Sequence, residues 1–193
     1  MHEHNDSDQQ KRSGWPRILL LACLACLAAL AVVARLVPHP LNLTLVGAVA
    51  LFSGATFSSR RIAYALPVIS MLIGDVFTGL HILLPAVYVC FLFNVALGRR
   101  ISSRLKFQSV FGMTLLGACV FFLVTNFASW IAFYDHSLNG LIQCYVKGIP
   151  WFRFTLVGDL LYSAILFGSL ALVESRFPIF RRSLPNDQIV PVT

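Results

Sequence analysis

The chain has 193 residues, of which 58% are hydrophobic and only 12% are charged. Soluble domains carry about 25% charged residues, so this composition excludes an ordinary soluble protein and indicates an integral membrane protein. The net charge of +7 does not indicate binding to nucleic acid, because the basic residues lie in short loops between apolar segments, where they orient a membrane protein.

Six apolar segments follow a polar tail over residues 1–15, which we expect to be disordered and cytoplasmic. A helix that crosses the hydrocarbon core needs about 20 residues, and only helices satisfy the backbone of segments so uniformly apolar. We therefore expect an all-α integral membrane protein with six transmembrane helices. The predicted spans, within a membrane domain over 16–176 and before a cytoplasmic tail over 177–193, are 16–37, 43–59, 62–80, 82–98, 108–134 and 153–174.

The first segment has an alternative interpretation as a signal peptide, because Lys11, Arg12 and Arg17 precede its Leu/Ala-rich core. Its apolar run reaches Val37, which exceeds the usual length of a signal-peptide core, and its removal would leave an odd number of spans. We therefore favour a transmembrane helix. Within it, Ala25 and Ala29 form a small-residue pair that predicts a docking face for a partner helix.

The segment 135–152 mixes apolar and polar residues and contains Gly140, Gly148 and Pro150. We expect a short helix or lid on the outer face, with Pro150 close before the start of the last span. Twelve of the 15 lysines and arginines lie on the opposite side of the predicted bundle. By the positive-inside rule, both termini are expected to be cytoplasmic.

Polar side chains inside the spans lie towards the outer side of the membrane. Asp75 and Asp159 each lie six residues from the outer end of a helix, or about 9 Å at about 1.5 Å per residue. Ionisable groups inside a membrane are costly and mark functional sites. We expect a small-molecule site formed by Asp75, His81, Tyr88, Asn126, Arg153 and Asp159, with His39 and Asn42 of the first outer loop closing over it.

The same polar cluster has a structural interpretation, since interhelical hydrogen bonds and ion pairs hold membrane helices together. Trp130 and Trp151 fit either a wall of the site or anchors at the membrane interface. No HxxH or HExxH spacing supports a metal site, and no cofactor is expected. No nucleophile–base pair is apparent in the sequence, so we expect a protein that is not an enzyme.

Four stretches carry a resemblance to a known family: RLVPHPLNLTLVGAVALFSGATF (35–57), GDVFTGLHILLPAVYVCFLFNVALGR (74–99), TNFASW (125–130) and IQCYVKGIPWFRFTLVGDLLYSAILFG (142–168). The chain resembles an uncharacterised bacterial six-helix membrane family related to the substrate-binding (S) components of energy-coupling-factor vitamin transporters. That resemblance implies an S-component-like bundle in the bacterial inner (cytoplasmic) membrane. Its function would be the capture of a vitamin or vitamin precursor for uptake.

The resemblance also implies the partners. These are a small-molecule substrate, the lipid bilayer and, unless the protein acts alone, a transmembrane coupling subunit driven by two ATPases. Arg153 is expected to pair with an anionic group of the substrate or with an aspartate. The alternative is a structural or assembly subunit in which the polar cluster only locks the helices.

Overall fold

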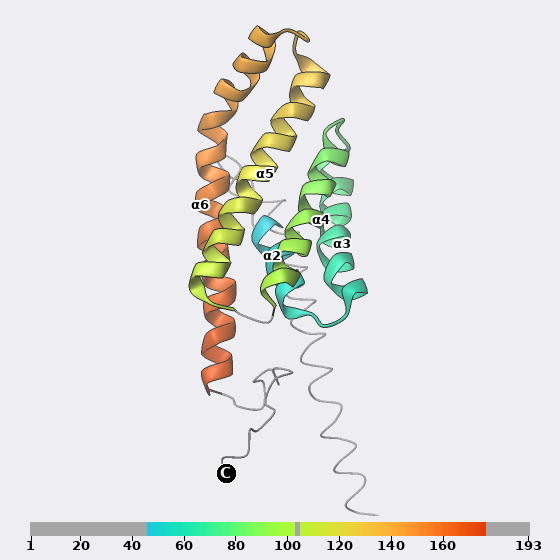
Figure 1. Ribbon diagram of the computed structural model, residues 1–193. Helices are drawn as coiled ribbons and strands as arrows, with labels where there is room; N and C mark the ends of the chain where they lie inside the picture. The colour runs from blue at the N-terminus through green and yellow to red at the C-terminus, as the bar shows by residue number, and fades with distance from the viewer. Residues whose placement is uncertain (1–45, 103–104, 177–193) are drawn as a thin grey trace, which may run out of the picture.

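The computed structural model describes residues 46–102 and 105–176, which form five α-helices and no strand (Figure 1). The prediction of an all-helical protein is confirmed for these residues. The predicted span 16–37 and the two tails lie outside them. The described helices, labelled as in Figure 1, are α2 (Val46–Thr56), α3 (Arg60–Thr78), α4 (Leu84–Ile101), α5 (Phe107–Phe133) and α6 (Leu138–Arg176).

Three of the described helices, α4, α5 and α6, are long and apolar enough to cross a membrane. The outer face of α5 is apolar at helical spacing, because Leu123, Phe127 and Ile131 are exposed at every fourth position. A soluble protein would place polar residues on such a face. The exposed apolar face is therefore suited to contact with lipid, as in a membrane protein.

Helix α2 lies at the centre of the bundle and contacts the four other described helices. Its residues 46–55 are all buried. The crossing with α4 is close because each helix offers a glycine to the other. A Cβ atom at Gly54 would collide with the carbonyl oxygen of Val95, and one at Gly98 would collide with that of Leu51. Small residues of this kind let membrane helices pack backbone against backbone.

Hydroxyl groups connect neighbouring helices inside the bundle. The buried Ser53 Oγ of α2 donates to the carbonyl oxygen of Ala63 on α3 at 2.7 Å. Thr114 Oγ1 of α5 donates to Ser163 Oγ of α6 at 3.2 Å. Because hydrocarbon offers no alternative partner, such bonds help to fix the register between helices.

Helix α6 differs from the prediction of an outer segment over 135–152 and a separate last helix. It runs without interruption through Pro150 for 39 residues, or about 58 Å at about 1.5 Å per residue. Proline removes only the hydrogen bond to the carbonyl of Val146, whereas leaving the helix would expose several backbone groups to lipid. The hydrocarbon core is about 30 Å thick, so α6 extends beyond it.

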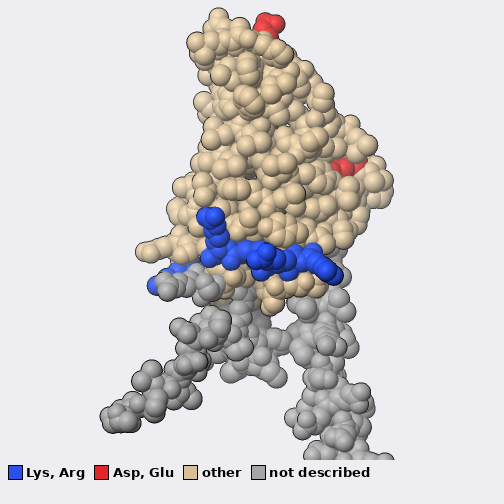
Figure 2. Space-filling model, turned by 45° about the vertical axis from the view of Figure 1, so that its right-hand side comes forward, with Lys and Arg blue, Asp and Glu red and all other residues tan. Residues whose placement is uncertain are grey.

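Basic residues gather at one end of the described bundle. Figure 2 shows lysine and arginine side chains in a band at the end where the α2–α3 and α4–α5 connections lie. Arg99, in the last turn of α4, donates through Nη1 to the carbonyl oxygen of Phe57 at 3.3 Å and so ties α4 to the α2–α3 connection. The residues that these two connections and the adjoining helix ends contribute are Arg60, Arg61, Arg99, Arg100 and Lys106.

Candidate functional site

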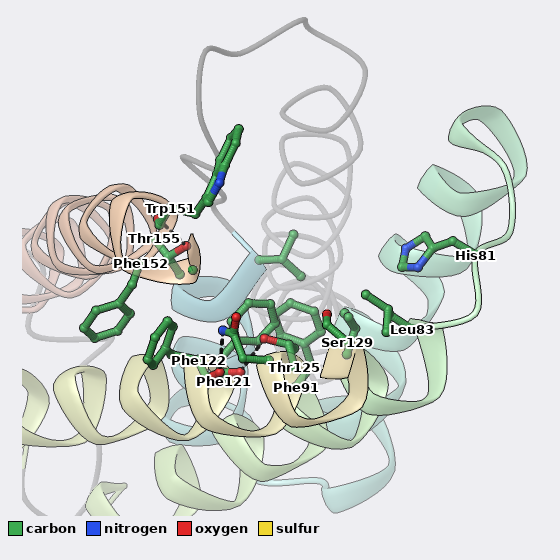
Figure 3. Close-up of a pocket in the computed structure, with 14 residues that line it drawn as sticks. His81, Leu83, Phe91, Phe121, Phe122, Thr125, Ser129, Trp151, Phe152 and Thr155 are labelled. Carbon is green, nitrogen blue, oxygen red and sulfur yellow. Dashed lines mark hydrogen bonds between the residues drawn. The ribbon is translucent and has the colours of Figure 1, made fainter. Parts of the chain in front are cut away.

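A cavity of about 380 Å³ lies between α2, α4, α5 and α6, away from the basic end of the bundle. Cavities that bind small molecules usually have volumes of about 300–1,000 Å³. The second half of α5 and the first half of α6 form two of its walls. The α3–α4 connection contributes the rim through His81 and Leu83 (Figure 3). We refer to this space as the outer cavity.

Aromatic rings form most of the apolar wall of the outer cavity. The rings of Phe122 and Phe152 bring α5 and α6 together, with their centroids 4.7 Å apart. Those of Phe91 and Phe121 join α4 to α5 at 5.8 Å. Trp151 of α6 completes this wall (Figure 3). Flat rings at such separations form a surface on which a planar ligand packs well.

Hydroxyl and amide groups face the outer cavity from two helices. Thr125, Asn126 and Ser129 come from α5, and Thr155 comes from α6. His81 adds an imidazole at the exposed rim. An apolar cavity with a few polar groups is the usual composition of a small-molecule site, in which the polar groups orient the ligand.

Asn126 is held in a defined orientation. Its Nδ2 donates to the carbonyl oxygen of Phe122 at 2.8 Å, and Cys144 Sγ donates to the Asn126 backbone carbonyl at 3.3 Å. Gly148 of α6 makes room for the amide, because a Cβ atom there would collide with Asn126 Oδ1. The amide oxygen thus lies at the contact between α5 and α6, on the cavity wall.

Four of the residues that the sequence analysis singled out lie at the outer cavity or below it. His81 and Asn126 line the cavity, as does Trp151. Asp159 lies in a smaller space of about 10 Å³ that shares Phe91, Phe121 and Thr155 with the outer cavity.

Asp75 and Tyr88 pair with each other outside the residues that line the outer cavity. Tyr88 donates its hydroxyl proton to Asp75 Oδ2 at 2.7 Å, across the contact between α3 and α4. Asp75 is 1% exposed. The pair therefore joins two helices, as the structural interpretation of the polar cluster predicts for these two residues.

Arg153 and Trp130 also lie away from the lining of the outer cavity. Arg153 is exposed, and its guanidinium group lies over the ring of Phe154 at 4.7 Å from the centroid. Trp130 Nε1 donates to the carbonyl oxygen of Asp135 at 2.9 Å, which fixes the α5–α6 connection. Four further predicted residues lie outside the described part of the chain: His39, Asn42, Ala25 and Ala29.

The described residues contain no group of three or more His, Cys, Asp or Glu side chains placed to hold a metal ion. The side chains that line the outer cavity offer packing against rings and hydrogen bonding, and one carboxylate lies below its floor.

Several lining residues were missed because the sequence analysis weighed ionisable groups most heavily. Phe121, Phe122, Thr125 and Ser129 share one face of α5 with Asn126, since their spacing follows the helical repeat. This face combines two adjacent aromatic residues with three polar ones. That pattern in an otherwise apolar span is the signal that would have identified them.

A family model described as a family of unknown function (DUF6580) matches residues 14–181. The comparisons found no match among curated proteins and none among solved structures. Because the family match covers most of the chain, including every described helix, the protein belongs to the DUF6580 family.

Proposed function

We propose that this protein is a membrane substrate-binding protein that captures a small micronutrient, such as a vitamin or a vitamin precursor, for uptake. The observation that carries the proposal is the outer cavity, which has the volume and the mixed aromatic and polar lining of a small-molecule site. The resemblance of four stretches of the chain to S-component relatives supports the same function. In this proposal no bond of the substrate is broken.

The proposal includes an orientation in the membrane. The arginines and lysine at the adjoining ends of α3, α4 and α5 would face the cytoplasm of a bacterial cell, in agreement with the positive-inside rule. The outer cavity lies towards the opposite end and would be entered from outside. Six spans with both termini in the cytoplasm, and a coupling subunit with two ATPases as partner, belong to the same proposal.

A structural or assembly subunit is the second candidate. The observation that favours it is the buried pair of Asp75 and Tyr88, which joins α3 to α4 and lies apart from the cavity lining. In this case the protein would hold no ligand, and substitutions on the cavity wall would change stability alone.

The test is mass spectrometry of small molecules released from detergent-purified protein. Ser129→Phe places a ring on the cavity wall, and Leu123→Phe places the same ring on the exposed face of the same helix. We expect one compound to be enriched with the native protein and with Leu123→Phe, and to fall about tenfold or more with Ser129→Phe, a change of about 1.4 kcal/mol in binding. Folded native protein that releases no more of any compound than Ser129→Phe would contradict the proposal.

A further inference from the structure

Below the floor of the outer cavity lies a buried carboxylate that the proposed function does not yet use. Asp159 of α6 is 5% exposed, and the small space beside it adjoins the outer cavity through Phe91, Phe121 and Thr155. Among the residues at the outer cavity and the small space, Asp159 alone carries a carboxylate.

The hydrogen bonding of Asp159 is incomplete among the described residues. The backbone N–H of Ala48, in the first described turn of α2, lies close enough to the carboxylate to interact favourably with its charge. The other contact is with Gly47, where a Cβ atom would lie 2.5 Å from Asp159 Oδ1, so that only glycine leaves room for the side chain. Oδ1 itself is buried and has no hydrogen-bond partner in the described part of the chain.

A buried hydrogen-bond acceptor such as Asp159 Oδ1 favours a ligand that carries a hydrogen-bond donor. Leaving a buried polar atom without a hydrogen-bond partner is costly, and leaving a buried charge without one costs more. A ligand N–H group that reaches Oδ1 would remove this cost, and a protonated nitrogen would also compensate the charge of the carboxylate.

Neither the outer cavity nor the small space has a lysine or arginine among its described lining residues, and the histidine of the cavity, His81, lies at the exposed rim. The two basic residues closest in sequence to the cavity wall on α6 are exposed and lie over other rings. Lys147 Nζ is 5.5 Å from the ring centroid of Tyr134, and Arg153 lies over Phe154. An anionic ligand would meet Asp159 without a compensating positive charge.

The aromatic wall also favours a positively charged ligand. The faces of Phe and Trp rings attract cations, and this attraction grows when water is excluded. Five such rings line the cavity above Asp159: Phe91, Phe121, Phe122, Trp151 and Phe152.

Resting on the proposed binding function, we infer that the ligand is a small organic cation. Its apolar, planar body packs between the rings of the outer cavity, and its protonated nitrogen points down to Asp159. The inference replaces the expectation that Arg153 pairs with an anionic group of the ligand, because Arg153 lies outside the lining.

The test uses three probes that share one ring and differ in their end group: benzylamine, benzyl alcohol and benzoate. Their binding to the detergent-purified full-length protein is measured by isothermal titration calorimetry. We expect benzylamine to bind about tenfold or more tightly than benzyl alcohol, which corresponds to about 1.4 kcal/mol, and benzoate to bind most weakly.

Two variants then assign the preference to one side chain. Asp159→Asn keeps the shape of the carboxylate and removes its charge, so the preference for benzylamine should fall to about twofold or less while benzyl alcohol still binds. Asp75→Asn changes the other buried aspartate, which lies outside the cavity lining, and should keep the preference.

The outcomes separate this inference from the proposed function. If benzyl alcohol and benzylamine bind equally well to the native protein, or if Asp159→Asn keeps the preference, the inference is wrong and the binding function stands. If none of the three probes binds, or if Ser129→Phe leaves their binding unchanged, the outer cavity is not a binding site and the proposed function falls as well.

Discussion

At the scale of single residues, two glycines predict opposite effects of the same substitution. A Cβ atom at Gly148 of α6 would collide with Asn126 Oδ1 and lie 3.0 Å from Phe122, whereas a Cβ atom at Gly112 of α5 meets nothing within 4 Å. We expect Gly148→Ala to lower the free energy of unfolding by about 1–3 kcal/mol through overpacking. Gly112→Ala should raise it by up to about 1 kcal/mol, because alanine favours helix more than glycine does.

Thermal unfolding of both variants in the same detergent measures this difference. Gly112→Ala serves as the matched control, since it adds the same methyl group to a neighbouring helix. Equal unfolding temperatures for the two variants would show that Asn126 and Gly148 are not in contact.

The residue scale also explains which site residues were predictable. Depth in the membrane follows from the number of residues to the end of a helix, and Asp75, Asn126 and Asp159 were placed by depth alone. Depth does not say which way a helix is rotated. Asp75 turns towards Tyr88, away from the cavity lining, while Asn126 turns into that lining. Arg153 is exposed, although it lies only two residues from Thr155 on the cavity wall.

At the scale of helices, the reciprocal glycines of α2 and α4 predict that their crossing tolerates no side chain. Gly98→Val or Gly54→Val would push apart two backbones whose carbonyl groups already face the glycines. Because α2 is buried over residues 46–55, the added side chain has no free space, so we expect overpacking to lower the free energy of unfolding by about 3 kcal/mol. The measurement is the yield of monodisperse protein in size-exclusion chromatography.

Gly112→Val is the control for this prediction, because it introduces the same β-branched side chain into a helix at an open position. A normal elution profile for Gly98→Val beside a normal profile for Gly112→Val would mean that α2 and α4 are not in backbone contact.

The helices differ in how far the sequence predicted them. The bounds of α3, α4 and α5 lie within three residues of the predicted spans, because long apolar runs in this composition have no stable alternative to helix. Helix α6 begins well before the predicted start. In a soluble protein, glycines and Pro150 would indicate that the helix breaks at this segment. In α6 the helix continues, because the hydrogen bonds of the remaining backbone outweigh the one that Pro150 cannot donate.

At the scale of the whole molecule, the proposed orientation predicts which surfaces a reagent outside the cell reaches. The five native cysteines are first replaced by serine. Asp135→Cys then marks the exposed α5–α6 connection, and Gln108→Cys marks the exposed start of α5 near the basic residues. We expect a membrane-impermeant maleimide to label Asp135→Cys in intact cells and Gln108→Cys only after permeabilisation. The reverse pattern would place the outer cavity on the cytoplasmic side. The protein could then not capture a substrate from outside the cell, and the proposed function would be wrong.

The central position of α2 has a consequence for the variation that the protein tolerates. A helix on the surface of a bundle accepts substitutions with the period of a helical turn, because only one of its faces is packed. Helix α2 has no such free face, since residues 46–55 are all buried. A saturation-mutagenesis library should therefore show low tolerance at every position of 46–55, without periodicity, beside a clear periodic pattern along α5. The shortest described helix would then be the part of this family that changes most slowly in evolution.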